Sequence, residues 1–496
     1  MRLWPAPAAG RILLGVCVAH FALWALANEP ALRSAWWFLD DYAFAAGDLL
    51  APRNVEHHLD QGRPGQLLWM FTFLLDGRED RTSANVLLRL GQGAIHALVG
   101  ALVAGLLWRE TGRVSTLLAA LPFVLWPYNG ETVLWRAAGQ YTVAALFSLL
   151  AIVLLRAPGP PTVARGVSGS LLVVAAMLTL QTAACAGASV WCLAVGLAFL
   201  RPEPPPWKRL GEEALYLADG YIVGGAASVS VAWLMAPGAS HRVALVSDLP
   251  AKGRLLMDAN GLFLTSPIFY PRWLAGLQVL FLGLPVLVLL GARRDPARLR
   301  QCLFAVGCIA AGLVTPYLAH LPVAENDITW RMFYLAPLVF AGVWAFLGEG
   351  LGDLRAARLA CYLVLLALLA TYFPLARASS SLYPQLFAAD RAMLRRIERT
   401  AAAAGVRAVC IPTDPDVAAG NPNPYGFDFS RWGVKLSAFL TEWSAPGFVR
   451  WFSPLEVAEG EPVASLCVAL CRSETGAGGF RVRRLEAHRV LCVCPP

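Results

Sequence analysis

The chain has 496 residues, of which 57% are hydrophobic and only 15% are charged. Soluble domains carry about 25% charged residues, so the composition excludes an ordinary soluble enzyme and indicates an integral membrane protein. The formal net charge of +8 does not indicate a nucleic-acid-binding protein, because most Lys and Arg residues lie in short connections between apolar runs, where the positive-inside rule places them.

Apolar runs of membrane-spanning length recur along the first three quarters of the chain. A transmembrane helix needs about 20 apolar residues, and on that basis we expect eleven spans. The expected spans cover residues 12–28, 86–108, 114–128, 141–156, 167–182, 186–200, 214–236, 273–291, 301–319, 332–348 and 359–376. The shorter run from Leu67 to Leu75 predicts a helix that lies at the membrane interface.

The first span has a second interpretation as a cleaved signal peptide. Arg2 and Arg11 precede the apolar part, which ends in the small-residue pattern Ala25-Leu26-Ala27. The many spans that follow favour a retained helix. Both interpretations place the next segment on the outer face.

The basic residues predict the orientation of the spans. With the N-terminus inside, every inner connection is basic, whereas the short outer loops hold only Arg136 and Arg331. The inner residues are Arg109, Arg113, Arg156, Arg165, Arg201, Lys208, Arg209, Arg293, Arg294, Arg298, Arg300, Arg355 and Arg358. We therefore expect a cytoplasmic N-terminus, with polar outer segments at 28–85, 128–140, 237–272 and 320–331.

The tail predicts a small α/β domain outside the membrane. A helix is expected from Ala388 to Ala404, and strands are expected at Val406–Ile411, Val463–Leu470 and Arg489–Val493. Its five cysteines are Cys410, Cys467, Cys471, Cys492 and Cys494. Five is an odd number, so the disulfide connectivity is open, and no paired spacing indicates a zinc site.

The predicted fold class is thus an all-α polytopic membrane protein with about eleven transmembrane helices in residues 1–376. An extracytoplasmic α/β domain follows in residues 377–496.

The first outer loop contains a pair of carboxylates, Asp40 and Asp41, next to Tyr42. Aromatic residues gather at the headgroup level, so the pair is expected at the lipid–water boundary. A carboxylate there is suited to remove a proton from an acceptor hydroxyl, and Tyr42 is a candidate substrate contact. The alternative is a solvated loop with a helix-capping aspartate.

Arg63 follows in the turn Gln61-Gly62-Arg63-Pro64-Gly65. A guanidinium held next to a proline can bind a phosphate with two hydrogen bonds; the alternative is an exposed turn. Just before it, Glu56-His57-His58-x-Asp60 contains metal-ligand types, but adjacent histidines point apart in a regular backbone. We therefore assign no metal-binding residue.

The second outer loop, residues 126–136, contains Glu131, Trp135 and Arg136. Charges near the membrane boundary are costly unless they are paired or used, and Trp135 offers a flat face for a sugar or isoprenoid. Glu131 and Trp135 are candidate substrate contacts, and Arg136 is a candidate phosphate contact. An interfacial salt bridge with an aromatic anchor is the alternative.

Three further cations complete the candidate set: Lys252 and Arg254 in the third outer segment, and Arg331 in the fourth. Each alone is typical of a surface charge. Together they predict a basic outer cavity that faces an anionic lipid headgroup.

These segments, in this order, resemble the GT-C class of integral membrane glycosyltransferases. The resemblance is closest to bacterial relatives of the tetratricopeptide-bearing transmembrane O-mannosyltransferases. It rests on Arg63, Asn85-Val86-Leu87-Leu88, His96-Ala97-Leu98, Leu121 to Pro127, Glu131 to Trp135, Tyr141 to Ala151 and Arg331 to Pro337. It covers residues 36–155 well and residues 325–345 weakly, and it does not extend to the tail.

Several positions depart from the family pattern. Gly62 and Gly65 flank Arg63 where Phe and Leu are usual, Trp126 stands where His is common, and Gly139-Gln140 replaces Gly-Arg. The tail contains no tetratricopeptide repeats. The first loop is also similar to that of bacterial O-antigen glucosyltransferases, so the acceptor class, whether glycan, lipid or protein, is open.

The resemblance implies an inverting glycosyltransferase of the bacterial inner membrane that uses a polyprenyl-phosphate sugar. Asp40 or Asp41 would be the general base, and Arg63, Arg136, Lys252, Arg254 and Arg331 would bind the donor phosphate. Some relatives use a divalent cation and others do not, so no cofactor is assigned. The competing hypothesis is a transporter or lipid flippase, a class that uses charged residues within spans and often has inverted repeats.

Overall fold

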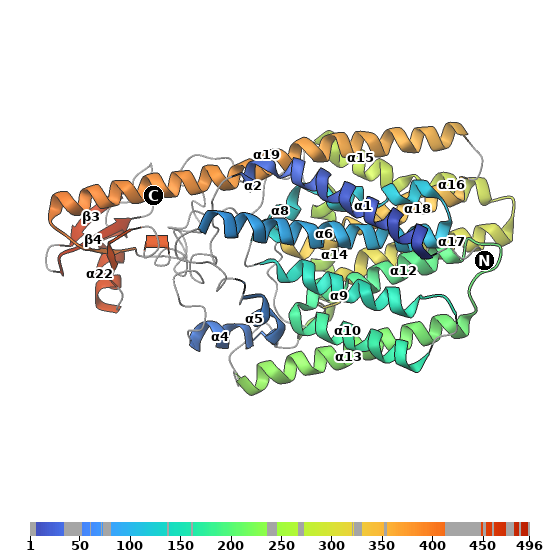
Figure 1. Ribbon diagram of the computed structural model, residues 1–496, viewed down its shortest axis with the longest axis horizontal. Coiled ribbons are helices and arrows are strands. Elements are labelled where there is room, and N and C mark those ends of the chain that lie inside the picture. The colour runs from blue at the N-terminus through green and yellow to red at the C-terminus, as the bar shows by residue number, and fades with distance from the viewer. Residues whose placement is uncertain are drawn as a thin grey trace.

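The computed structural model describes residues 6–33, 52–59, 61–70, 72, 81–135, 138–159, 162–235, 246–265, 272–319, 321, 330–351, 355–411, 448–449, 453–458, 461–472, 481–485 and 488–494. The molecule is elongated (Figure 1). A bundle of helices forms one end, a small sheet forms the other, and one long helix, α19, joins them.

The bundle contains the helices from α1 to α19. Its first half contains α1 (Ala6–Ala27), α2 (Glu29–Leu32), α4 (Pro52–Leu59), α5 (Pro64–Met70), α6 (Arg81–Thr111), η3 (Val114–Leu118), α7 (Leu121–Val124), η4 (Pro127–Asn129), α8 (Gly130–Val133), α9 (Gln140–Leu155), α10 (Val163–Thr179), α11 (Gln181–Ala184) and α12 (Ala186–Ala198). Its second half contains α13 (Trp207–Met235), α14 (Leu249–Thr265), α15 (Arg272–Gly283), α16 (Pro285–Ala292), α17 (Pro296–Val314), η6 (Thr315–Tyr317), η7 (Trp330–Leu335), α18 (Leu338–Gly350) and α19 (Arg355–Ala404).

Eight helical segments of the described chain are long and apolar enough to cross a membrane. They are Ala9–Ala27, Asn85–Thr111, Gln181–Ala198, Trp207–Met235, Trp273–Ala292, Pro296–Tyr317, Phe333–Gly350 and Arg355–Ala404. Shorter apolar helices cover Val114–Val124, Gln140–Leu155 and Val163–Thr179, where three more spans were expected. The chain is therefore a polytopic helical membrane protein, and the count of eleven spans stays a prediction.

Close helix packing in the bundle depends on small residues. Gly220 and Gly224 lie one turn apart on α13 and face α10. A Cβ on Gly220 would lie 2.7 Å from the Val173 Cβ, and one on Gly224 would lie 2.7 Å from the Met177 Cβ. Small residues at this spacing let two helix backbones approach closely, which is how membrane helices gain packing energy without a hydrophobic driving force.

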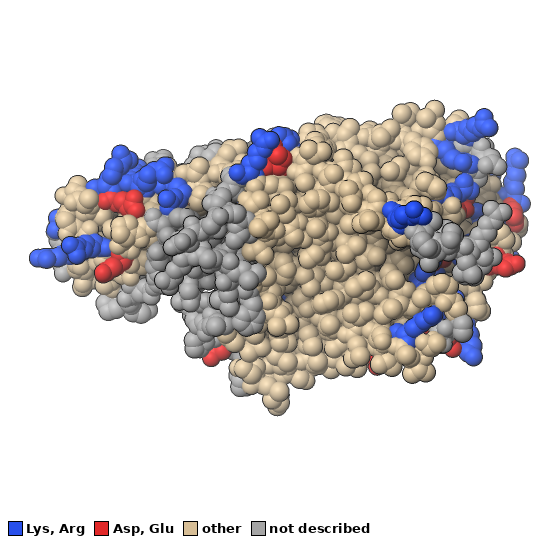
Figure 2. Space-filling model, in the orientation of Figure 1, with Lys and Arg blue, Asp and Glu red and all other residues tan. Residues whose placement is uncertain are grey.

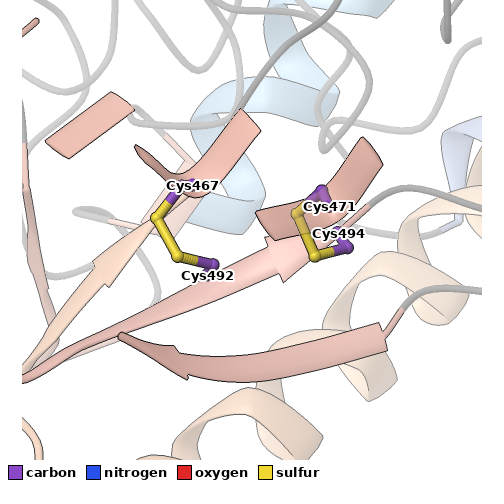
Figure 3. Close-up of a disulfide and its surroundings, with 4 residues drawn as sticks. All are labelled: Cys467, Cys471, Cys492 and Cys494. Carbon is purple, nitrogen blue, oxygen red and sulfur yellow. A yellow bond between two sulfur atoms is a disulfide. The ribbon is translucent and has the colours of Figure 1, made fainter. Parts of the chain in front are cut away.

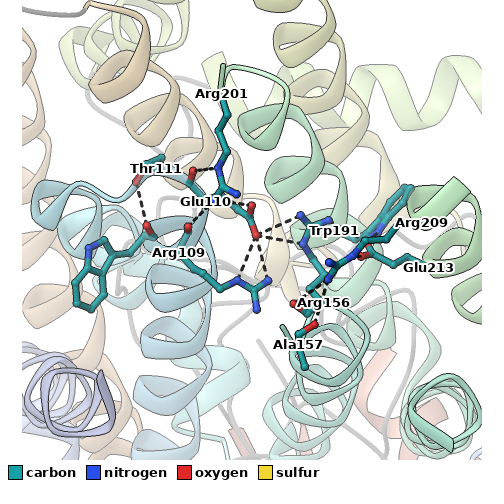
Figure 4. A network of polar contacts seen from close by, with 10 residues as sticks. Arg109, Glu110, Thr111, Arg156, Ala157, Trp191, Arg201, Arg209 and Glu213 are labelled. Atoms are coloured by element: carbon teal, nitrogen blue, oxygen red, sulfur yellow. Dashed lines mark hydrogen bonds and ion pairs between the residues drawn. The ribbon is translucent and has the colours of Figure 1, made fainter. Parts of the chain in front are cut away.

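At the end of the bundle that lies away from the sheet, buried ion pairs join several helices (Figure 4). Glu110 at the end of α6 binds Arg156 at 3.2 Å and Arg201 at 2.9 Å. Glu213 on α13 binds Arg156 at 2.9 Å and Arg209 at 3.1 Å. The side chains of Glu110, Arg156 and Glu213 are each 6% exposed or less.

Further hydrogen bonds complete this network, which we call the inner clamp, where inner means the end away from the sheet. Trp191 on α12 donates its indole N–H to Glu213 at 3.0 Å. Arg209 donates to the carbonyl oxygen of Ala157 beyond the end of α9, at 3.1 Å. Buried ions are tolerated only when they are paired and hydrogen-bonded in this way, so the inner clamp holds α6, α9, α12 and α13 together at this end.

Charge is distributed along the molecule as a bilayer requires. Figure 2 shows a broad belt without Lys, Arg, Asp or Glu, bounded by charged groups toward both ends. Large apolar side chains are exposed on the apolar helices, among them Leu171, Ile222 and Leu363 at 58–71% exposure. In a water-soluble protein such a belt would be an aggregation surface; here it matches the lipid tails.

The last helix runs without a break from the final expected span into the tail. α19 has 50 residues, so the expected helix from Ala388 to Ala404 is its continuation rather than a separate element. Arg377 donates to Glu29 at 2.6 Å and to the carbonyl oxygen of Leu26 at 3.0 Å. These bonds join α19 to the end of α1 and to α2, at the border of the apolar belt that lies toward the sheet.

The sheet at the end of α19 has four strands in the order β2-β1-β4-β3. They are β1 (Ala408–Cys410), β2 (Glu456–Val457), β3 (Arg481–Leu485) and β4 (Val490–Cys494). β1 is parallel to β2 and β4, whereas β3 is antiparallel to β4. One face packs on α19 through Leu394 and Ile397, with Val409 and Val493 opposite.

The other face of the sheet is joined to α22 (Glu461–Arg472) by two disulfides, Cys467–Cys492 and Cys471–Cys494 (Figure 3). The prediction of a strand at 463–470 was therefore wrong. Cys467 and Cys471 are four residues apart, which places both on one face of a helix. Their partners are two residues apart on β4, which places both on one face of a strand.

A second correction concerns residues 249–265. They were expected within a polar outer loop, but they form the helix α14. Charged residues at 252, 254 and 258 interrupt the apolar run, so hydropathy alone does not reveal the helix.

Candidate functional site

Several expected site residues lie outside the part that the structure describes. Asp40, Asp41, Tyr42 and Arg136 fall in undescribed segments. Two more are placed only by their backbones. Glu131 lies on α8 and Arg331 on η7, without a described side chain. The described geometry therefore bears on Arg63, Trp135, Lys252 and Arg254.

Arg63 is held in one orientation by two glutamines. Its Nε donates to Gln181 Oε1 at 2.9 Å, and its Nη1 donates to Gln61 Oε1 at 2.8 Å. Both acceptors are neutral amides, so neither cancels the charge of the guanidinium. Gln181 is fixed in turn, because its Nε2 donates to Ser228 Oγ at 2.6 Å.

Glycine at position 62 permits this arrangement. Gly62 has a φ of +66°, which residues with a side chain rarely adopt. Its carbonyl oxygen accepts a hydrogen bond from Ser228 Oγ at 2.8 Å, and a Cβ would overlap Ser228. Gly62 is thus part of a docking contact between this turn and α13.

A stripe of buried polar residues runs along α6. Asn85, Arg89, Gln92 and His96 are all 0% exposed, and their spacing of four, three and four residues places them on one face of the helix. Sequence reasoning identified Asn85 and His96 through the resemblance and missed Arg89 and Gln92. The signal that could have found them is this helical spacing of polar residues within an apolar span.

His96 connects the stripe to the segment that begins near Arg331. Its Nδ1 lies 3.0 Å from the hydroxyl of Tyr334, and its Nε2 lies 3.4 Å from the carbonyl oxygen of Val124. The Phe123 ring packs on His96 with a centroid distance of 4.6 Å. Residues from α6, α7 and η7 therefore meet at this point.

Gln92 connects the stripe to the second outer loop and to α5. Its Nε2 donates to the carbonyl oxygen of Trp135 at 3.1 Å. A Cβ on Gly139 would overlap both the Gln92 amide and the Trp69 ring. Since Trp69 lies on the short helix that begins just after Arg63, the Arg63 turn is joined through these contacts to the α6 stripe.

The Arg63 turn and His96 lie at similar depths in the bundle. His96 precedes Glu110 of the inner clamp by 14 residues on α6, which is about 21 Å of helix. Ser228, on which the Arg63 turn docks, follows Glu213 by 15 residues on α13, or about 22 Å. Both groups therefore belong to the half of the bundle that faces the sheet, and we call them together the outer polar site, where outer means toward the sheet.

Lys252 and Arg254 do not share one environment. Lys252 is 3% exposed, whereas Arg254 is exposed. Two residues that are two positions apart lie on different sides of a helix. Both were expected in an outer loop, but both lie on α14.

Trp135 is buried at 4% exposure, so in this structure its ring is part of the packed core. Within the described residues, no group of three or more His, Cys, Asp or Glu side chains is arranged to hold a metal ion. In the segment at 56–60, Glu56 is exposed whereas His58 is buried, so these two side chains point in different directions.

The outer polar site contains a guanidinium held in one orientation and linked, through Trp69 and Gln92, to a buried row of polar groups. A guanidinium held in this way can bind an anionic group. Comparisons of the chain with protein-family models, curated proteins and solved structures find no match.

Proposed function

We propose that this protein is an inverting glycosyltransferase that takes a sugar from a polyprenyl-phosphate donor. The acceptor is a hydroxyl of a cell-envelope glycan, lipid or protein on the outer face of a bacterial inner membrane. The observation that carries the proposal is the outer polar site, in which two neutral amides hold Arg63 and contacts of Trp69 with Gln92 link its turn to the α6 stripe.

The proposed chemistry is a single displacement. Asp40 or Asp41 takes the proton from the acceptor hydroxyl, whose oxygen forms a bond to the anomeric carbon with inversion. The bond from that carbon to the phosphate oxygen breaks, and its electron pair leaves with the polyprenyl phosphate. Arg63 stabilises the negative charge of the leaving group.

Features at both ends of the molecule support the proposed orientation in the membrane, with the sheet outside and the inner clamp on the cytoplasmic side. Basic residues surround the inner clamp, which is typical of the cytoplasmic side. The two disulfides lie at the opposite end, and disulfides persist in oxidising compartments outside the cytoplasm. The donor lipid would then reach the outer polar site from the outer face, where the first loop is also expected.

The inner clamp also favours transfer over translocation. A flippase must open a path for a headgroup to both faces, and the polar residues of such a path usually continue across the membrane. In this bundle the α6 stripe ends at His96, and buried ion pairs hold the helix ends about 21 Å further in. Residues 97–108 of α6 are apolar, which favours a site used from one face, as a transferase requires.

The test is sugar transfer by the purified protein from a panel of polyprenyl-phosphate sugars. Asp40→Asn and Asp41→Asn are compared with Asp48→Asn, which removes a carboxylate from the same loop. The proposal expects loss of transfer in at least one of the first two variants and near wild-type transfer in the third. Full activity in both Asp40→Asn and Asp41→Asn would show that neither aspartate is the general base.

A further inference from the structure

The surface of the tail carries a concentration of arginines that the proposed chemistry does not use. Among the described residues from 388 to 494, seven arginines and one glutamate, Glu456, are exposed. The arginines are Arg395, Arg396, Arg399, Arg407, Arg483, Arg484 and Arg489. Figure 2 shows blue side chains gathered at this end of the molecule.

Three of these arginines are placed by the geometry of α19. Leu394 and Ile397 face the sheet and are buried at 1% and 0% exposure. Arg395 and Arg399 are one turn apart on the opposite face, and Arg396 lies beside them. Glu398, which is partly exposed three residues after Arg395, offsets part of their mutual repulsion. Three exposed arginines on one helix face exceed that single carboxylate, and packing does not explain them.

The edge strand of the sheet adds two more arginines at the same end of the molecule. β3 lies at the edge of the sheet and contacts α19, and it carries exposed Arg483 and Arg484. Charges on an edge strand also prevent unwanted strand pairing. That role does not account for the arginines of α19, which belong to no strand.

We propose that the outward face of α19 around Arg395, Arg396 and Arg399 binds an anionic envelope glycan, one that carries phosphate or carboxylate groups. Guanidinium groups bind both anions with two hydrogen bonds. The inference uses the sidedness argued above, but it does not require that the protein transfer a sugar.

Distance along α19 distinguishes a glycan from the membrane itself. Arg377 marks the outer border of the apolar belt through its bond to Glu29. Arg395 follows 18 residues later, which is about 27 Å along the helix. At physiological salt the attraction of a charged surface decays over about 8 Å, so lipid headgroups are too far away to be the ligand.

The test measures binding of fluorescent dextran sulfate to the full-length protein in nanodiscs of uncharged lipid, with uncharged dextran of the same length as a control. The triple variant Arg395→Gln/Arg396→Gln/Arg399→Gln is compared with Arg293→Gln/Arg294→Gln/Arg300→Gln, which removes three exposed arginines from the other end of the molecule. A thermal unfolding curve for each variant checks that it is folded.

The proposal predicts binding of dextran sulfate but not of dextran, about tenfold weaker binding in the first triple variant, and little change in the second. Raising the salt concentration should weaken binding further. Equal loss in both variants, or equal binding of the two polymers, would overturn it. So would selective binding to vesicles of anionic lipid without binding to dextran sulfate. Because no sugar is transferred in this assay, its result is independent of the proposed catalysis.

Discussion

The Nδ1 of His96 lies 3.0 Å from the hydroxyl of Tyr334, although 238 residues separate them in the chain. The contact joins the polar stripe of α6 to η7, which begins next to Arg331. It places two segments that were grouped only by resemblance side by side in one bundle.

Removing the hydroxyl in Tyr334→Phe should weaken this junction. The buried imidazole loses a hydrogen-bond partner within the membrane, where such bonds contribute about 1 kcal/mol. Thermal unfolding in nanodiscs measures the loss. Tyr362→Phe is the control, because Tyr362 is partly exposed and packs on Trp344, so its unfolding temperature should stay close to that of the wild type. Equal effects would mean that the His96 contact contributes nothing specific.

Gly139→Ala should disrupt the contact between α5 and α6. The new methyl group would overlap Trp69 and Gln92, and overpacking of this kind costs about 1–3 kcal/mol. Gly91→Ala is the control, because it lies on α6 with no atom within 4 Å of its added Cβ and should be neutral or slightly stabilising. Stability and sugar transfer should both fall in the first variant, and a normal Gly139→Ala protein would contradict the packing described here.

Gln181→Glu should weaken donor binding without removing a side chain. A carboxylate at this position would pair with Arg63 Nε, which now donates to the neutral Gln181 amide at 2.9 Å. The new carboxylate would compete with the donor phosphate for the guanidinium, and we expect the KM for the donor to rise about tenfold. The control, Gln385→Glu, makes the same change at an exposed position on α19. An unchanged KM in Gln181→Glu would show that Arg63 does not bind the donor phosphate.

Glu213→Gln should destabilise the inner clamp. It leaves Arg156 and Arg209 without the carboxylate that binds them at 2.9 Å and 3.1 Å, and breaking a buried ion pair costs about 3–5 kcal/mol. The neighbouring variant Glu212→Gln removes the same charge from a partly exposed position and should change the unfolding free energy much less. Similar losses in both variants would argue against the clamp.

Cys410 should be unreactive at neutral pH. It lies opposite Cys492 in the register of β1 and β4. Burial raises the pKa of its thiol. The folded state therefore favours the protonated thiol, and this contribution to stability is lost as the pH rises through the raised pKa. Maleimide labelling mapped by mass spectrometry should be slow at pH 7 and faster above about pH 9. Rapid labelling at pH 7 would contradict the buried position.

Hydropathy predicted the helical membrane architecture well, because each apolar run long enough to cross a bilayer has few other stable states. It failed in two segments. The helix α14 was missed because Lys252 and Arg254 interrupt its apolar run. The helix α22 was predicted as a strand because its apolar composition outweighed the helical spacing of Cys467 and Cys471.

The candidate site was predicted in part. Arg63 was selected from its local turn, but its partner Gln181 lies 118 residues away, and no local pattern reveals such a pair. Arg89 and Gln92 were overlooked because an apolar average over α6 hides four polar positions on one face. Asp40 and Asp41 lie outside the described residues, so their role stays a prediction.

The central claim is tested most directly by following a radiolabelled polyprenyl-phosphate sugar in liposomes that contain the purified protein and a hydroxyl acceptor. The account predicts that the wild-type protein transfers the label and releases free polyprenyl phosphate, and that Arg63→Gln slows this release while the exposed control Arg300→Gln does not. Movement of the intact donor across the bilayer without release, or equal release by Arg63→Gln and the wild type, would contradict it.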